Sequence, residues 1–148
     1  MFIKQISVFL ENVRGSLREL TELLGVRGID LMALSVADSV NFGIVRCVVS
    51  GDQTDLAVET LKGVGYTARV TDVICISVPD HPAGLAEVLK IIDDANISVE
   101  YLYSIIRQSA TSALIVFKLS DPERGCKVLQ ESGVTVYLQE QIDALAKR

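Results

Sequence analysis

The sequence is poor in the residue types on which most catalytic, metal-binding and membrane functions depend. It contains one His, three Cys and three Pro among its 148 residues. No apolar run approaches the roughly 18 residues that a membrane-spanning helix requires. The first ten residues include Lys4 and Gln5 and lack a small-residue cleavage site. These absences argue against a membrane span and a signal peptide, and we therefore expect a cytoplasmic protein.

Basic residues are also scarce. The chain has 14 Lys and Arg against 19 Asp and Glu, which gives a formal net charge of -5. Affinity for nucleic acid rests mostly on clustered Lys and Arg that neutralise phosphates. The charge balance therefore predicts that nucleic acid is not a partner.

The three cysteines do not form a disulfide or metal-ligand pattern. Cys47, Cys75 and Cys126 are odd in number, lie far apart and have apolar neighbours. This arrangement favours three buried thiols in a reducing compartment.

Apolar residues are abundant, and they recur in two copies. Hydrophobic residues make up 49% of the chain and charged residues 22%, which is typical of a folded globular protein. Shifting the chain by 68 residues superposes identical residues: Leu17 on Leu85, Glu19 on Glu87, Ile29 on Ile97, Leu34 on Leu102, Leu61 on Leu129, Gly65 on Gly133, and Thr67 on Thr135. Ser50 matches Ser120 at an offset of 70, so the copies differ in loop length, as duplicated folds tolerate.

Each copy predicts the order βαββαβ. Apolar and β-branched runs indicate strands at 5–10, 29–36, 43–49 and 67–72 in the first copy, and at 73–78, 97–106, 113–119 and 134–138 in the second. Leucines at helical spacing indicate a helix after the first strand of each copy. The expected helix ends are Gly28 and Asn96 for the first helices, Asp52 and Gly65 for the second helix of copy one, and Asp121, Pro122 and Gly133 for that of copy two. Residues 139–148 predict a short terminal helix.

This order predicts an α+β protein made of two tandem ferredoxin-like units, each with a four-stranded antiparallel sheet and both helices on one face. We place the units at residues 1–70 and 71–148. Residues 68–78 contain no Gly or Pro, so we expect the units to be rigidly fused.

The other face of each sheet needs a cover. Residues 73–76 and 114–117 are apolar on both sides, whereas a sheet with one wet face alternates apolar and polar residues. Another sheet or another subunit is the simplest cover. We expect a homodimer or a larger assembly, on the assumption that one chain lacks such a cover.

The loops between first strand and first helix carry the polar residues that could bind a ligand. They are residues 11–17 and 79–85, and both contain Gly at the helix start. A helix N-terminus presents unpaired backbone N–H groups, which suit a carboxylate. From spacing alone, the favoured interpretation is that these are ordinary turn and cap residues.

A family resemblance favours the binding interpretation. The sequence Glu11-Asn12-x-x-Gly15-x-Leu17, followed after the helix by Gly28-Ile29-Asp30-Leu31, resembles the ACT domain, in two copies that cover essentially the whole chain. The stretches 9–12 and 42–44 are similar to those of stand-alone tandem ACT proteins. The resemblance implies a non-catalytic regulatory protein that binds an amino acid or a similar small ligand and needs no cofactor or metal.

The resemblance also implies site residues, because family members hold the ligand between the loop of one unit and the second strand of a neighbour. The implied residues are Asn12, Arg14, Gly15, Ser16, Leu17 and Asp30 in copy one, and Asp80, Ala83, Gly84 and Ser98 in copy two. Both copies depart from the family pattern, with Arg14 in place of Pro and Ala83 in place of Gly. Because Ala adopts a positive φ less easily than Gly, copy one is the preferred site.

Other functions fit less well. His81 occupies a variable loop position, which indicates a solvent-facing turn residue rather than a general base. Acylphosphatases share the topology and use a loop Arg, but their Gly-rich loop is missing. RNA-binding domains of this topology need aromatics on central strands, and we interpret Tyr101, Tyr103 and Phe117 as packing residues. The alternative is an interaction module with vestigial ligand loops, acting as a regulatory subunit of a metabolic enzyme.

Overall fold

The computed structural model describes residues 2–38, 41–106 and 112–146. Its strands are β1 (Ile3–Glu11), β2 (Leu31–Asp38), β3 (Phe42–Val49), β4 (Ala68–Pro79), β5 (Val99–Ser104), β6 (Ser112–Leu119) and β7 (Val136–Tyr137). Its helices are α1 (Ser16–Val26), α2 (Thr54–Gly63), α3 (Gly84–Asp94), α4 (Pro122–Glu131) and α5 (Gln139–Ala146), and a 3₁₀ turn, η1 (Gly51–Gln53), precedes α2. The predicted α+β order of two βαββαβ units is confirmed.

The strands form one continuous antiparallel arrangement in the order β2-β3-β1-β4-β6-β5, and β7 pairs with β4. The junction is β4, which belongs to both units. Its first half pairs with β1, ending at Val73 opposite Ile3, and its second half pairs with β6, beginning at Ile74 opposite Phe117. The two strands predicted at 67–72 and 73–78 are therefore one strand, as the absence of Gly and Pro suggested. A division at residues 70 and 71 falls within β4, so the two-domain boundary stays a prediction.

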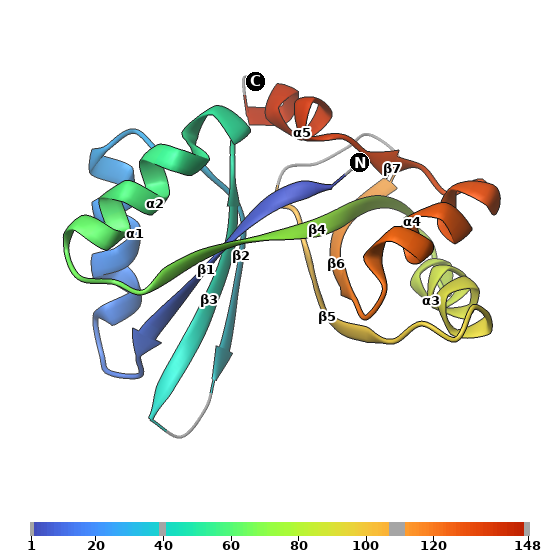
Figure 1. The fold of residues 1–148 in the computed structure, drawn as a ribbon, viewed down its shortest axis with the longest axis horizontal. Helices are drawn as coiled ribbons and strands as arrows, with labels where there is room; N and C mark the ends of the chain where they lie inside the picture. Colours follow the sequence, from blue (N-terminus) through green and yellow to red (C-terminus); the bar gives the residue numbers. More distant parts are fainter. Residues whose placement is uncertain (1, 39–40, 107–111, 147–148) are drawn as a thin grey trace.

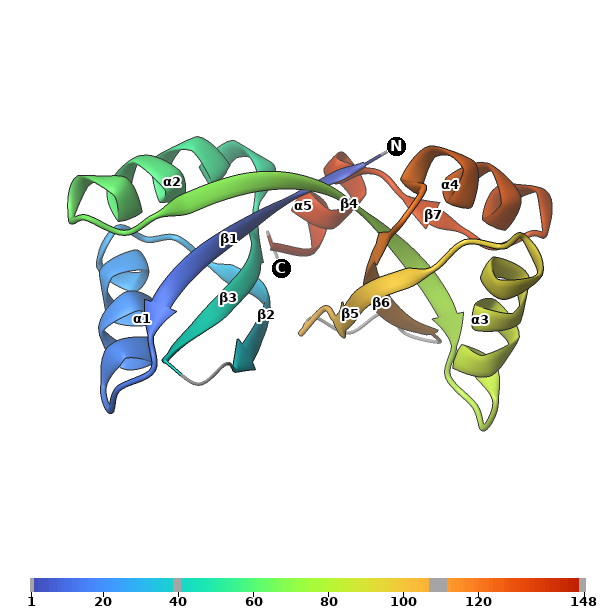
Figure 2. The same ribbon diagram turned by 60° about the horizontal axis from the view of Figure 1, so that its bottom comes forward.

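The helices cover the outer faces of the sheets, and the inner faces meet each other. Figures 1 and 2 show α1 and α2 on the outside of the first unit and α3 and α4 on the outside of the second. Each unit has its own core between sheet and helices, and a third core lies between the sheets. This third core contains Met32 and Val48 from the first unit and Cys75, Tyr103 and Val116 from the second. The assumption that one chain lacks a cover for these faces is wrong, because each sheet covers the other.

Helix α5 closes one end of the core between the sheets. Ile142 and Leu145 are buried in it, 0% and 9% exposed. Polar contacts hold the helix to the first unit: the Gly51 N–H donates to Asp143 Oδ1 (2.6 Å), and the Lys4 N–H donates to Gln139 Oε1 (2.8 Å). The predicted terminal helix is confirmed to Ala146, and the last two residues of the prediction lie outside the described residues.

A buried glutamine links the two sheets. Gln5 on β1 has no exposed surface, yet its side chain makes three hydrogen bonds. Its Nε2 donates to Tyr101 Oη (2.8 Å) and Ser7 Oγ (3.1 Å), and its Oε1 accepts from Tyr103 Oη (2.6 Å). The Arg46 guanidinium lies 3.7 Å from the centroid of the Tyr101 ring. Tyr101 and Tyr103 are thus packing residues, as predicted, and they also satisfy a buried amide.

The helix ends agree with the sequence in all but one place. Asp121 caps α4 by accepting from the Arg124 N–H (3.2 Å), with Pro122 at the first helical position. The predicted exits Gly28, Asn96, Gly65 and Gly133 all have positive φ. The prediction that Asp52 caps α2 is wrong, because Asp52 lies in η1 and accepts instead from the Ser50 hydroxyl. The last strand is also shorter than predicted, since β7 has two residues.

The three cysteines are buried and free, as predicted. Burial raises the pKa values of the Cys47 and Cys75 thiols to about 12 and also raises that of Cys126. A raised pKa lowers the fraction of thiolate, which is the reactive form, and burial also restricts access to the sulfur atoms.

We therefore expect the native protein to resist a thiol reagent such as DTNB at mildly alkaline pH. All three thiols should react once guanidinium unfolds the chain. Absorbance of the released thiolate measures the reaction. Rapid labelling of any thiol in the folded protein would contradict the burial described here.

Candidate functional site

The first candidate loop turns sharply at Gly15 and leads directly into α1. Gly15 has φ of 90°, a left-handed conformation that glycine adopts without a steric penalty. The turn is closed by the Ser16 N–H, which donates to the Val13 carbonyl (3.2 Å). Helix α1 has no side-chain cap hydrogen bond at its N-cap residue. Its first turn therefore presents backbone N–H groups and the positive end of the helix dipole at the loop.

The second loop has the same shape although its sequence differs. Ala83, at the position equivalent to Gly15, has φ of 67°, and α3 likewise has no side-chain cap. The departure at Ala83 therefore adds strain but does not change the backbone conformation. The next residue, Gly84, is buried, and an added Cβ would lie 2.0 Å from the Pro79 carbonyl oxygen. The close approach of residue 84 to the Pro79 carbonyl thus requires glycine. The equivalent position in copy one is Ser16, so copy one does not share this constraint.

The charged and amide side chains of the loops are exposed, and Asn12 and His81 each have a hydrogen-bond partner. Asn12 Nδ2 donates to Asp38 Oδ1 at the end of β2 (2.6 Å). Arg14 and Asp80 are exposed, and Leu17 is 37% exposed. His81 is exposed, as predicted for a turn residue, with Nδ1 2.8 Å from the Pro82 carbonyl oxygen.

Asp30 and Ser98 lie far from the loops of their own units. Each follows the C-terminal end of an 11-residue helix whose N-terminal end carries the loop, a separation of roughly 16 Å along the helix axis. The Asp30 N–H donates to Gln53 Oε1 (3.2 Å), and the Ser98 N–H donates to Ser120 Oγ (3.0 Å). Figure 2 shows the starts of α1 and α3 at the two outer flanks, away from the start of β2. One chain therefore does not bring either loop together with Asp30.

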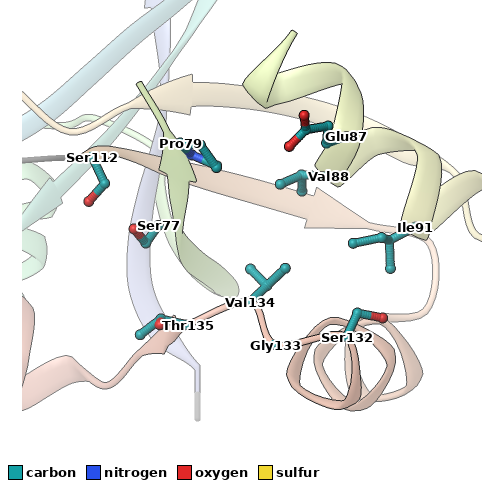
Figure 3. A pocket seen from close by; sticks show the side chains of 10 residues that line it. All are labelled: Ser77, Pro79, Glu87, Val88, Ile91, Ser112, Ser132, Gly133, Val134 and Thr135. Carbon is teal, nitrogen blue, oxygen red and sulfur yellow. The ribbon is translucent and has the colours of Figure 1, made fainter. Parts of the chain in front are cut away.

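Two cavities lie beside these loops, and the sequence interpretation missed both. The larger, about 420 Å³, lies between the end of β4, the first turns of α3 and the turn from α4 to β7 (Figure 3). The smaller, about 300 Å³, occupies the equivalent place in the first unit. The repeat contained the signal, because Glu19 and Glu87 line the two cavities at equivalent positions, as do Thr67 and Thr135.

Within the described ranges, no helix is both long and apolar enough to cross a membrane. In the same part of the chain, no group of three or more His, Cys, Asp or Glu side chains is placed to hold a metal ion.

Comparison with known proteins agrees with this geometry. The family model described as "ACT domain pair" matches residues 1–146. Protein BT0572 from Bacteroides thetaiotaomicron has a solved structure similar to this one, with a TM-score of 0.87 and 36% identity over 97% of this chain and 96% of that chain. No curated protein matches the sequence.

More distant structures share the fold. The regulatory subunits of aspartate kinase from Thermus thermophilus and Thermus flavus, each 16% identical, have TM-scores of 0.66 and 0.61 over 86% of this chain and 90% of theirs. At this identity the likeness concerns the fold alone. The match along residues 1–146 and the 36% identity to BT0572 are decisive, and the chain belongs to the ACT domain pair family.

Proposed function

We propose that this ACT pair is a non-catalytic regulatory protein that binds an amino acid or a similar small ligand. The observation that carries the proposal is the duplicated loop, in which a left-handed residue, Gly15 or Ala83, precedes a helix without a side-chain cap. The first amide of each helix closes the turn, and the following first-turn amides have no partner within the helix, so a carboxylate can accept from them. The loops are otherwise different in sequence, so the shared backbone shape is the feature that both copies retain.

In the proposed site, Asn12, Gly15 and Ser16 hold the ligand carboxylate, and Arg14 adds positive charge beside it. Asp30 from a neighbouring chain accepts from the α-ammonium, because a helix N-terminus supplies donors and no acceptor. In copy two, Asp80, Ala83 and Gly84 form the loop. Ser98 replaces Asp30 there and lacks its charge, so copy one remains the preferred site.

This site requires self-association, since one chain keeps its loop and Asp30 apart. Two copies related by a twofold axis would each supply the loop to one site and Asp30 to the other. The aromatic rings of Phe9 and Phe42 support a further interface, because they are 45% and 47% exposed and contact each other at 6.0 Å between centroids. We expect light scattering at micromolar concentration to report a dimer, and a monomer would contradict the shared site.

The proposal is tested by ligand binding. We expect a thermal-shift panel of the standard amino acids to show stabilisation by one or two, because a ligand that binds only the native state raises its stability. In calorimetric titration with such an amino acid, Asp30→Ala should weaken binding about tenfold through loss of a charge-assisted hydrogen bond. Gly15→Val should weaken it at least as much, by blocking approach to the backbone.

Ser98→Ala provides the matched control. It removes the polar side chain at the equivalent position of copy two and should leave affinity nearly unchanged. A larger loss for Ser98→Ala than for Asp30→Ala would move the working site to the second loop.

The alternative function is an interaction subunit of a metabolic enzyme whose ligand loops are vestigial. The Asn12 hydrogen bond to Asp38 favours it, because a ligand must displace Asp38 from that amide. The fold is also shared by proteins described as regulatory subunits of aspartate kinase. A flat thermal-shift panel would favour this alternative over the ligand sensor.

A further inference from the structure

The cavity in the second unit is lined by both hydroxyl-bearing and aliphatic side chains. In Figure 3 Ser77, Ser112 and Thr135 lie on one side, and Val88, Ile91 and Val134 lie toward the other, where Glu87 and Ser132 are also found. Its volume of about 420 Å³ lies within the range of small-ligand sites, about 300–1,000 Å³.

A single carboxylate stands at the rim of this cavity. Glu87 projects from the first turns of α3 and is exposed to solvent (Figure 3). The net charge of the chain, -5, adds to the attraction of this site for a cation. The cavity therefore combines a carboxylate that can pair with a cation, hydroxyl groups that can donate hydrogen bonds, and aliphatic side chains.

The repeat explains why this cavity is larger than its counterpart in the first unit. Ser77 replaces Phe9, and Val134 replaces Tyr66, so two aromatic rings that line the smaller cavity are absent from the larger one. A backbone hydrogen bond beside them is the same in both copies. The Phe9 N–H donates to the Thr67 carbonyl (3.1 Å), and the Ser77 N–H donates to the Thr135 carbonyl (3.0 Å). Side-chain size, and not a change of fold, opens the second cavity.

The acidic residues also differ between the copies. Glu19 and Glu87 are equivalent, but the smaller cavity has a second carboxylate, Glu11, where the larger has Pro79. The second unit thus keeps one carboxylate and gains apolar space. This combination suits a ligand with one positive charge and an aliphatic group.

We propose that the cavity of the second unit binds a small aliphatic primary amine. The ammonium lies at Glu87, and the aliphatic group packs against Val88, Ile91 and Val134. A free amine and an aliphatic amino acid share this chemistry. The hydroxyls of Ser77, Ser112 and Thr135 can donate to the carboxylate that only the amino acid carries.

This site is separate from the loop site proposed above. Pro79, the first residue of the second loop, lines the cavity, but none of the residues assigned to the loop sites or their partner positions, Asp30 and Ser98, does, and the cavity lies within one chain. Binding at the two sites can therefore be tested independently.

The test is calorimetric titration of the full chain with 3-methylbutylamine, leucine and 3-methylbutanoate. We expect at least one of the two amines to bind and the carboxylate without an amine to bind more weakly. Leucine binding more tightly than 3-methylbutylamine would identify an amino acid as the ligand class, and the reverse order would identify a simple amine.

Two variants and their controls locate the binding. Glu87→Gln should weaken binding about fivefold, a modest factor because the exposed charge is screened by solvent. The equivalent Glu19→Gln should have no effect. Ser77→Phe installs the residue of the first unit and should weaken binding more than about tenfold by filling the cavity. Val134→Tyr repeats that test at a second position, should Ser77→Phe fail to fold.

Absence of saturable binding by either amine at millimolar concentration would overturn the proposal. So would 3-methylbutanoate binding as tightly as the amines, or an affinity that none of Glu87→Gln, Ser77→Phe and Val134→Tyr changes. Leucine binding that Gly15→Val abolishes and Ser77→Phe spares would also overturn it, and would instead support the loop site.

Discussion

Replacing Gln5 with Leu should lower the free energy of unfolding by about 3 kcal/mol, although the substitution puts an apolar residue into an apolar core. The Tyr103 hydroxyl donates to Gln5 Oε1, and it is nearly buried, with the residue 8% exposed. Burial raises the pKa of Tyr103 well above its ordinary value, so its hydroxyl stays a protonated donor. Removing the acceptor leaves that donor unsatisfied, which costs about 1–3 kcal/mol. Tyr101 loses its partner as well, which places the expected loss at the upper end.

A double variant separates this effect from simple packing. Replacing both partners with apolar groups can be nearly neutral, so Gln5→Leu combined with Tyr103→Phe should be no less stable than Gln5→Leu alone. Urea unfolding followed by circular dichroism measures all three variants. Losses that simply add would contradict the coupling between Gln5 and Tyr103. Ser7→Ala removes the longest hydrogen bond of Gln5, at 3.1 Å, and should change stability little.

Replacing Gly84 with Ala should also cost about 3 kcal/mol of stability. The new Cβ would lie 2.0 Å from the Pro79 carbonyl oxygen and 3.0 Å from its carbon. These are backbone atoms and cannot rotate away, so the loop or α3 must move. Overpacking of this kind typically costs about 1–3 kcal/mol, and contact with backbone atoms places this case at the upper end.

The adjacent residue provides the control for Gly84→Ala. Ala83→Gly removes a Cβ from a residue with φ of 67°, which relieves left-handed strain and stabilises the fold. Glycine also increases the conformational entropy of the unfolded chain, which destabilises the fold. Its net effect should lie within about 1 kcal/mol. Equal losses for the two substitutions, measured by thermal unfolding, would show that the loop is merely sensitive to any change.

Much of the fold could be predicted because its signals are local. Period-2 and helical apolar patterns located the strands and helices, and glycine or asparagine marked the helix exits at residues 28, 65, 96 and 133. Asp52 was misassigned because an Asp before a helix is a common cap. A 3₁₀ turn precedes the helix in the structure, and the Asp52 side chain accepts a hydrogen bond from the Ser50 hydroxyl instead.

The candidate site was predicted only in part. The positions of the two loops follow from sequence spacing and family resemblance, and the structure places them at equivalent helix starts. The left-handed conformation of Ala83 was not expected, because alanine adopts a positive φ less easily than glycine. The pairing of the loop with Asp30 depends on a neighbouring chain. The cavities depend on residues from three segments of the first unit and four segments of the second. Only the alignment of Glu19 with Glu87, Gly65 with Gly133 and Thr67 with Thr135 pointed to them.

By itself, the sequence determined the order of elements, the duplication and the buried thiols, because each depends on residues close together in the chain. Only the tertiary structure decided what covers the inner faces of the sheets and how large the cavities are. Apolar strands show that a cover is needed without showing which surface supplies it. Here β4 continues from one unit into the other, so that the second sheet packs against the first. Gln5 forms hydrogen bonds with Tyr101 and Tyr103, which lie 96 and 98 residues further along the chain.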